Sequence, residues 1–170
     1  MTKYVVATVD EIAPGQRKIV DVGGHSIGVF NLGGEFFALL NRCPHQGGPL
    51  CQGRTWGLIE AQRPGEYQFS REGEILTCSW HGWEFDIRTG QSWCNPARLR
   101  VRAYEVHVEA GATLLADRDA PAEGMVKGPY FAETYPVTLD GQYVVIDIVR
   151  HRTDRIDRTS NGSVSSAARV

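Results

Sequence analysis

Two short stretches of the sequence each pair one cysteine with one histidine: Cys43-Pro44-His45-Gln46-Gly47-Gly48 and Cys78-Ser79-Trp80-His81-Gly82-Trp83. Cysteine supplies a soft thiolate ligand and histidine supplies a neutral imidazole nitrogen, and both bind transition metals. Because each stretch offers two ligands, we interpret Cys43, His45, Cys78 and His81 as the ligands of one metal centre.

The ligand types suit a centre of two chemically different irons, with both sulfurs on one iron and both imidazoles on the other. This is the ligand set of a Rieske 2Fe-2S cluster. The pattern C-x-H followed by C-x-x-H-G, with Gly47 and Leu50 after the first loop, resembles the Rieske family. The resemblance implies that the four residues bind a Rieske-type 2Fe-2S cluster.

A structural zinc site is the alternative, because Cys and His also form tetrahedral zinc centres. Paired zinc ligands usually stand about two to four residues apart, whereas a single residue separates Cys43 from His45. The spacing therefore disfavours zinc. An interaction module stabilised by zinc would be colourless and would have no redox role.

The segment between the two loops departs from the family pattern. Residues 46 to 77 number 32, about twice what the resemblance leads us to expect. We assign the excess to an insertion at about 57–71, where Pro64-Gly65 separates two β-rich runs and predicts an added hairpin. Such a hairpin is a candidate docking element for a partner.

Composition favours a turn-rich β protein of one domain. The 170 residues include 19 Gly and 8 Pro, without a long stretch of helical periodicity. We predict an all-β fold, and the resemblance implies an antiparallel Rieske-type β-sandwich of stacked small sheets, with the cluster between two loops at hairpin tips. The expected strands are 17–22, 26–31, 35–41, 74–77, 84–87 and a hairpin around Asp140-Gly141.

The Rieske domain is expected to span 1–149, with a loop extension at about 109–133 and a disordered tail at 150–170 that has little to bury. Neither a signal peptide nor a bilayer-spanning stretch is evident, so we expect a soluble, cytoplasmic protein without a membrane partner. The formal net charge of -2 argues weakly against a nucleic-acid partner.

Membrane-anchored Rieske subunits carry an extra cysteine in each loop, joined as a disulfide, but the matching positions here are Gly48 and Trp80. That bridge cannot form. The other two cysteines, Cys51 and Cys94, are interpreted as reduced small hydrophobes, with a disulfide between them or an exchange with a cluster ligand as the less favoured alternatives.

Several other side chains are candidates for surface roles. Arg98, Arg100 and Arg102 alternate and are expected on one strand face, as a basic edge or a docking face for an acidic partner. His25 and His107 are interpreted as surface histidines. In the family a proline-bearing loop covers one side of the cluster, and Asn95-Pro96-Ala97 is the matching segment.

The resemblance implies a one-electron carrier similar to the soluble ferredoxins of ring-hydroxylating oxygenase systems, without catalytic residues of its own. Its partners would be an NAD(P)H-dependent flavoprotein reductase and a terminal oxygenase. A Rieske-like small subunit of a larger oxidoreductase, such as nitrite reductase, is the alternative. A self-contained oxygenase is excluded, because His25, His107 and His151 lack the spacing of a mononuclear iron site.

A low reduction potential is expected. High-potential relatives carry the loop disulfide and donate a serine hydroxyl to the cluster just after the second His-Gly, where this chain has Trp83. We therefore predict a midpoint below about 0 mV, in the lower part of the Rieske range.

Overall fold

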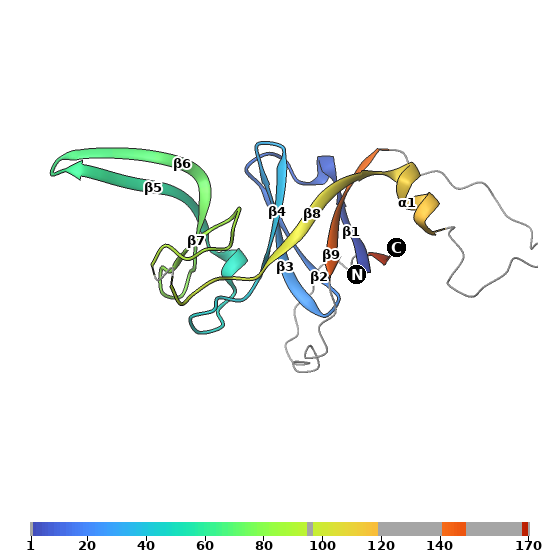
Figure 1. The fold of residues 1–170 in the computed structure, drawn as a ribbon, viewed down its shortest axis with the longest axis horizontal. Helices are drawn as coiled ribbons and strands as arrows, with labels where there is room; N and C mark the ends of the chain where they lie inside the picture. Colours follow the sequence, from blue (N-terminus) through green and yellow to red (C-terminus); the bar gives the residue numbers. More distant parts are fainter. Residues whose placement is uncertain (1, 95–96, 119–140, 149–167, 170) are drawn as a thin grey trace, which may run out of the picture.

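The computed structural model describes residues 2–94, 97–118, 141–148 and 168–169, and these form two antiparallel sheets (Figure 1). The larger sheet has seven strands in the order β10-β1-β9-β8-β4-β3-β2, and the smaller has the order β5-β6-β7. The strands of the larger sheet are β1 (Thr2–Thr8), β2 (Arg17–Val22), β3 (His25–Leu32), β4 (Glu35–Leu40), β8 (Ala103–Ala110), β9 (Gln142–Ile148) and β10 (Ala168–Arg169). The smaller sheet contains β5 (Arg54–Arg63), β6 (Glu66–Thr77) and β7 (Glu84–Asp86). The predicted all-β, antiparallel fold is confirmed.

The meander β2-β3-β4 forms because glycine pairs occupy its two turns. Gly23 and Gly24 have φ angles of 58° and 85°, and Gly33 and Gly34 have 64° and 100°. Two consecutive positive φ angles are what a two-residue hairpin turn of the favoured hand requires, and glycine adopts them without strain. Strand β4 then leads directly to the first Cys-His loop.

Two hydrophobic cores hold the sheets. One packs β1, β9 and β8 against β2–β4, around Ile27, Val144 and Ile146. The other lies where the small sheet meets the large one, and it includes Leu39, Leu50, Leu76, Phe85 and Ile87 together with the cysteines of both Cys-His loops. Full burial of each such Leu, Ile or Phe contributes about 1.5–3 kcal/mol. The second core therefore fixes the two loops in relation to each other.

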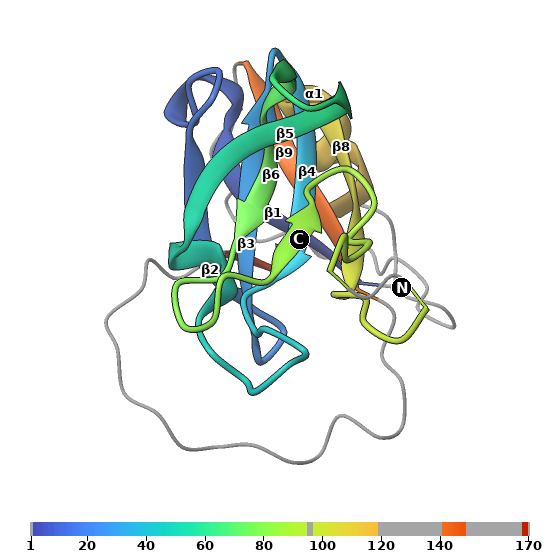
Figure 2. The same cartoon turned by 90° about the vertical axis from the view of Figure 1, so that its left-hand side faces the viewer.

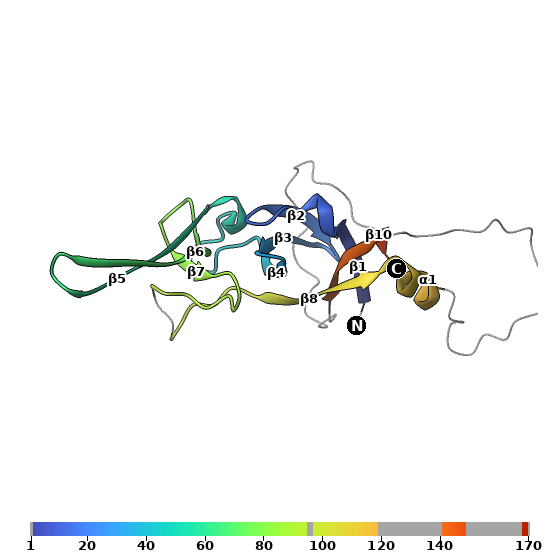
Figure 3. The ribbon, with the colours of Figure 1, turned by 90° about the horizontal axis from the view of Figure 1, so that it is seen from above.

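The small sheet lies at one end of the molecule, and its β5-β6 hairpin extends beyond that end, away from the large sheet (Figures 1 and 3). Viewed from that end, β5 arches in front of the large sheet (Figure 2). The hairpin predicted from Pro64-Gly65 is confirmed and is longer than expected, since β5 and β6 pair from Arg54↔Thr77 to Arg63↔Glu66.

The structure corrects three expectations. The expected loop extension at 109–133 instead begins with the last two residues of β8 and continues as helix α1 (Gly111–Arg118), and residues 119–133 lie outside the described residues. Within the expected disordered tail, Ala168–Arg169 pairs with β1, so the expectation fails at these two residues, and residues 150–167 and 170 lie outside the described residues. Arg98 lies in a turn and Arg100 in an isolated bridge before β8 begins, so the three arginines do not share a strand face.

Two short 3-10 helices, η1 (Val9–Glu11) and η2 (Leu50–Gln52), complete the described elements. In this part of the chain, α1 and every other helix falls short of the length and hydrophobicity needed to cross a bilayer.

Candidate metal centre

The two Cys-His loops have the same pattern of backbone hydrogen bonds. In the first loop, the Cys43 N–H donates to the Gly48 carbonyl and the Gly47 N–H donates to the Cys43 carbonyl, both at 2.8 Å. In the second loop, the Cys78 N–H donates to the Trp83 carbonyl at 2.8 Å and the Gly82 N–H donates to the Cys78 carbonyl at 2.9 Å. The two loops thus repeat the same turn.

Glycine is required at the fifth position of each turn. Gly47 has a φ of 80° and Gly82 a φ of 67°, in the left-handed region that side chains with a Cβ rarely adopt. This explains why each metal-binding histidine candidate is followed by glycine within two residues. The sequence motif therefore encodes the backbone conformation as well as the side chains.

The two thiols are buried and in contact. Cys43 and Cys78 are each 2% exposed. Burial raises the pKa of the Cys43 thiol, and its hydrogen bond and charge interaction with Cys78 raise it further, while the N–H groups of His45 and Gln46 donate to the sulfur and oppose the rise. Two buried thiolates side by side need a positive partner, and an iron ion supplies that charge.

The two imidazoles are also adjacent. The ring centroids of His45 and His81 lie 4.9 Å apart with their planes at 89°. The Nδ1 atom of His45 is buried without a hydrogen-bond partner in the described part of the chain, which costs about 1–3 kcal/mol for an ordinary side chain. A nitrogen in that position fits a metal ligand.

The four predicted ligands are therefore brought together as a thiol pair and an imidazole pair. Within the described residues, no three His, Cys, Asp or Glu side chains are grouped as ligands of one metal ion would be. A Rieske cluster does not require such a group, because each iron takes two protein ligands and the inorganic sulfides complete its coordination. The donor set fits this cofactor.

Two tryptophans, Trp80 and Trp83, pack against the Cys-His loops. The Trp83 ring lies 4.7 Å from that of His45. A Cβ at Gly48 would lie 2.7 Å from the Trp80 ring, so Trp80 packs on the backbone of the opposite loop while remaining 57% exposed. The sequence analysis matched Gly48 and Trp80 to the positions of the missing loop disulfide, and the structure shows that the two residues are in contact across the loops.

A basic cleft of about 430 Å³ lies beside the first loop. Its lining includes His45, Arg42, Arg100 and Arg102. Sequence reasoning singled out the last two arginines but missed Arg42, although it directly precedes Cys43. The three arginines therefore place positive charge near the His45 imidazole.

The other candidate residues from the sequence analysis lie outside the two Cys-His loops. Both other cysteines are free thiols: Cys51 is buried and Cys94 is exposed. Burial raises the pKa of the Cys51 thiol to about 12. His107 lies with its Nε2 2.6 Å from a Glu109 carboxylate oxygen, among charges as predicted. Of the proline-bearing segment, Asn95 and Pro96 lie outside the described residues.

A family model described as the Rieske 2Fe-2S domain matches residues 2–105 of the chain. The chain belongs to the Rieske 2Fe-2S family. As a Rieske protein it carries a 2Fe-2S cluster of the Rieske type. The geometry of the two Cys-His loops agrees with this assignment.

This Rieske protein resembles ferredoxin components of oxygenase systems. It is 30% identical over 72% of its length to the ferredoxin component of the alkene monooxygenase system of Xanthobacter autotrophicus, of which it covers 88%. It is 31% identical over 69% of its length to the biphenyl dioxygenase ferredoxin subunit of a Pseudomonas species, of which it covers 93%. A solved structure, the ferredoxin of carbazole 1,9a-dioxygenase from Nocardioides aromaticivorans, is 31% identical over 64% of this chain and 91% of its own, with a TM-score of 0.48.

Proposed function

We propose that this Rieske protein is a one-electron carrier that delivers electrons to a terminal oxygenase. The main observation behind the proposal is that two loops with the same backbone hydrogen bonds bring together two buried thiols and, beside them, two imidazoles. The relatives named as ferredoxin components of oxygenase systems support the same role. A flavoprotein reductase that draws on NAD(P)H is the proposed electron donor, and the cytoplasm is the proposed location.

In this proposal Cys43 and Cys78 bind one iron, and His45 and His81 bind the other. The buried Nδ1 of His45 is the proposed ligating atom of that ring. When bound, the cluster supplies a one-electron redox couple. Its formal charge with two thiolates and two neutral imidazoles is near zero when oxidised, which makes addition of an electron easier than with four thiolates.

The residues around the ligands determine how electrons enter and leave. His81 is exposed and His45 half-buried, so the imidazole side of the centre is the proposed contact with redox partners. The buried thiol side, packed against Leu39, Leu76 and Phe85, excludes water. Backbone N–H donors from His45 and Gln46 stabilise negative charge on the Cys43 sulfur.

Chemical analysis and electron paramagnetic resonance test the proposal. The purified protein is expected to contain about two irons and two inorganic sulfides per chain and to give a resonance signal only after reduction by dithionite. A redox titration should give a midpoint below about 0 mV, since Trp83 replaces the serine hydroxyl donor of high-potential relatives. Zinc in place of iron would refute the carrier role, and a midpoint above about +100 mV would refute the low-potential assignment.

A further inference from the structure

Among the residues that the structure describes, the outer half of the β5-β6 hairpin is a two-stranded ribbon that pairs with no third strand. Strand β7 pairs with β6 only at Ile75–Thr77, near the second Cys-His loop. Beyond Leu58 and Ser70, β5 and β6 pair with each other out to Arg63↔Glu66. We call this ribbon, residues 58–70, the arm. A two-stranded ribbon by itself is only marginally stable in water.

One side of the arm exposes large apolar side chains. Ile59 and Phe69 are cross-strand partners, and Tyr67 lies two residues from Phe69 on the same face. The Phe69 ring extends this patch to Trp56, with ring centroids 5.9 Å apart. We call these four residues the apolar stripe. The exposed fraction of the residue is 62% for Ile59, 51% for Phe69, 75% for Tyr67 and 50% for Trp56.

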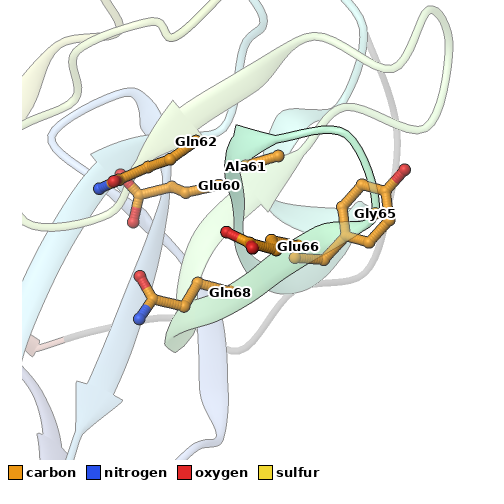
Figure 4. Close-up of a pocket in the computed structure, with 7 residues that line it drawn as sticks. Glu60, Ala61, Gln62, Gly65, Glu66 and Gln68 are labelled. Atoms are coloured by element: carbon orange, nitrogen blue, oxygen red, sulfur yellow. The ribbon is translucent and has the colours of Figure 1, made fainter.

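The opposite face of the arm is polar. Figure 4 shows its carboxylate and amide side chains, Glu60, Gln62, Glu66 and Gln68, which line a hollow together with Ala61, Gly65 and Tyr67. The Ser70 hydroxyl donates to a Glu60 carboxylate oxygen at 3.1 Å on this face. The arm is therefore amphipathic, as a strand pair is when one face is covered.

The base of the arm is a sharp bend with several side-chain contacts. Between the pairs Trp56↔Ile75 and Leu58↔Ser70, β5 has one residue and β6 has four, which makes a sharp bend. Arg71, in that bend, has a φ of 53° and its guanidinium binds both Glu74 and the buried Asp86. Gly57 has no room for a Cβ, which would lie 2.6 Å from the Phe69 ring and from the Ser70 carbonyl.

We propose that the apolar stripe is the contact surface for a second copy of this chain, with two arms packed stripe against stripe about a two-fold axis. The exposed part of the four side chains amounts to about 500 Å² per chain. Two copies would bury about 1,000 Å², the lower limit for a specific interface. Ile59, Phe69 and Tyr67 bring no charged group to the stripe, so a second stripe is complementary to it.

The geometry also suits a reversible association. An isologous contact uses the same patch twice, so one apolar stripe per chain is sufficient for a dimer. Because the buried area is at the lower limit, the dimer is expected to dissociate on dilution. The association does not require the cluster or a redox partner.

Sedimentation velocity of the complete holoprotein over a range of concentrations tests this proposal. The wild type is expected to pass from a monomer of 18.8 kDa to a dimer as its concentration rises. Tyr67→Ser, which removes the most exposed side chain and leaves both cores intact, should raise the dimer dissociation constant at least tenfold. Tyr67→Ser combined with Phe69→Ser should leave only monomer.

Gln68→Ser is the matched control, since it lies between the two aromatic residues but on the polar face. It should leave the dissociation constant unchanged. A wild type that stays monomeric at the highest concentrations would overturn the proposal and leave the stripe to a different protein partner. A dimer that survives Tyr67→Ser unchanged would overturn it equally, and the visible spectrum of the cluster verifies that each variant is folded.

Discussion

At the scale of single residues, the two histidines distinguish this centre from a cluster bound by four thiolates. Replacement of His81 with cysteine adds a negative charge to the ligand set, so the oxidised form is favoured. We predict that His81→Cys lowers the midpoint by on the order of 100 mV or more if the cluster assembles, because four-thiolate clusters lie near -400 mV. Redox titration followed by visible spectroscopy measures the shift.

The control for that variant is His25→Cys, which makes the same replacement at the start of β3. It should leave the midpoint unchanged, because His25 belongs to neither loop. A wild-type midpoint in a His81→Cys protein that retains its cluster would mean that His81 is not a ligand.

Arg42 acts on the same centre through its charge. The Cβ position of Gly47 lies 3.5 Å from the Arg42 Nε, so the guanidinium lies against the first loop. A nearby positive charge favours the reduced cluster. We predict that Arg42→Gln lowers the midpoint by roughly 20–60 mV at low ionic strength and by less in high salt, because this side chain is exposed to solvent.

Arg63→Gln, at the far end of β5, is the matched control for Arg42→Gln and should leave the midpoint unchanged. Equal shifts in the two variants would indicate a general effect of net charge rather than a local one. Titrations at two salt concentrations separate these cases.

At the scale of elements, the two loops are joined by the contact of Trp80 with Gly48. An added methyl group at Gly48 would lie 2.7 Å from the indole, so one of the loops must move. We predict that Gly48→Ala lowers the free energy of unfolding by about 1–3 kcal/mol. Denaturant unfolding of the holoprotein measures this loss.

Trp80→Ala removes the obstructing ring and provides the test of that cause. In a double-mutant cycle, Gly48→Ala should cost less in the Trp80→Ala background than in the wild type. An equal cost in both backgrounds would attribute the loss to the glycine backbone instead.

The elements that the sequence predicted well are those encoded by neighbouring residues. The turns at Gly23-Gly24 and Gly33-Gly34 and the hairpin at Pro64-Gly65 follow from local backbone preference, and the structure confirms them. Helix α1 was missed because Gly111–Arg118 lies next to a loop-like composition that hid its short amphipathic run. Alternation placed Arg98, Arg100 and Arg102 on a strand, but no strand partner exists for the first of them in the described residues.

In the candidate site, too, the features encoded by neighbouring residues were predicted and the contacts between distant segments were missed. Its four predicted ligands lie in two local motifs, so spacing and residue type were enough to propose them. The packing of Trp80 on Gly48 and the position of Arg42 beside Gly47 arise only when the loops fold and the second core brings them together. Contacts between distant segments leave no periodic signal in one sequence.

At the scale of the whole molecule, we expect the body to fold without the arm. Both cores lie in the body, and the arm beyond Leu58 and Ser70 adds no residue to either. Leu58 and Ser70 are cross-strand partners, so a two-residue Asn-Gly turn joins them without strain after residues 59–69 are removed. The bend at Arg71, with its ion pairs to Glu74 and Asp86, is retained.

We predict that this shortened chain folds, assembles its cluster and keeps its midpoint within about 20 mV of the wild type, because no charge changes near the loops. It should sediment as a monomer, since the apolar stripe is reduced to Trp56. Iron content, redox titration and sedimentation velocity on one preparation measure these properties together. Loss of the cluster would show that the arm supports the second Cys-His loop through β6, and that the body is not an independent unit.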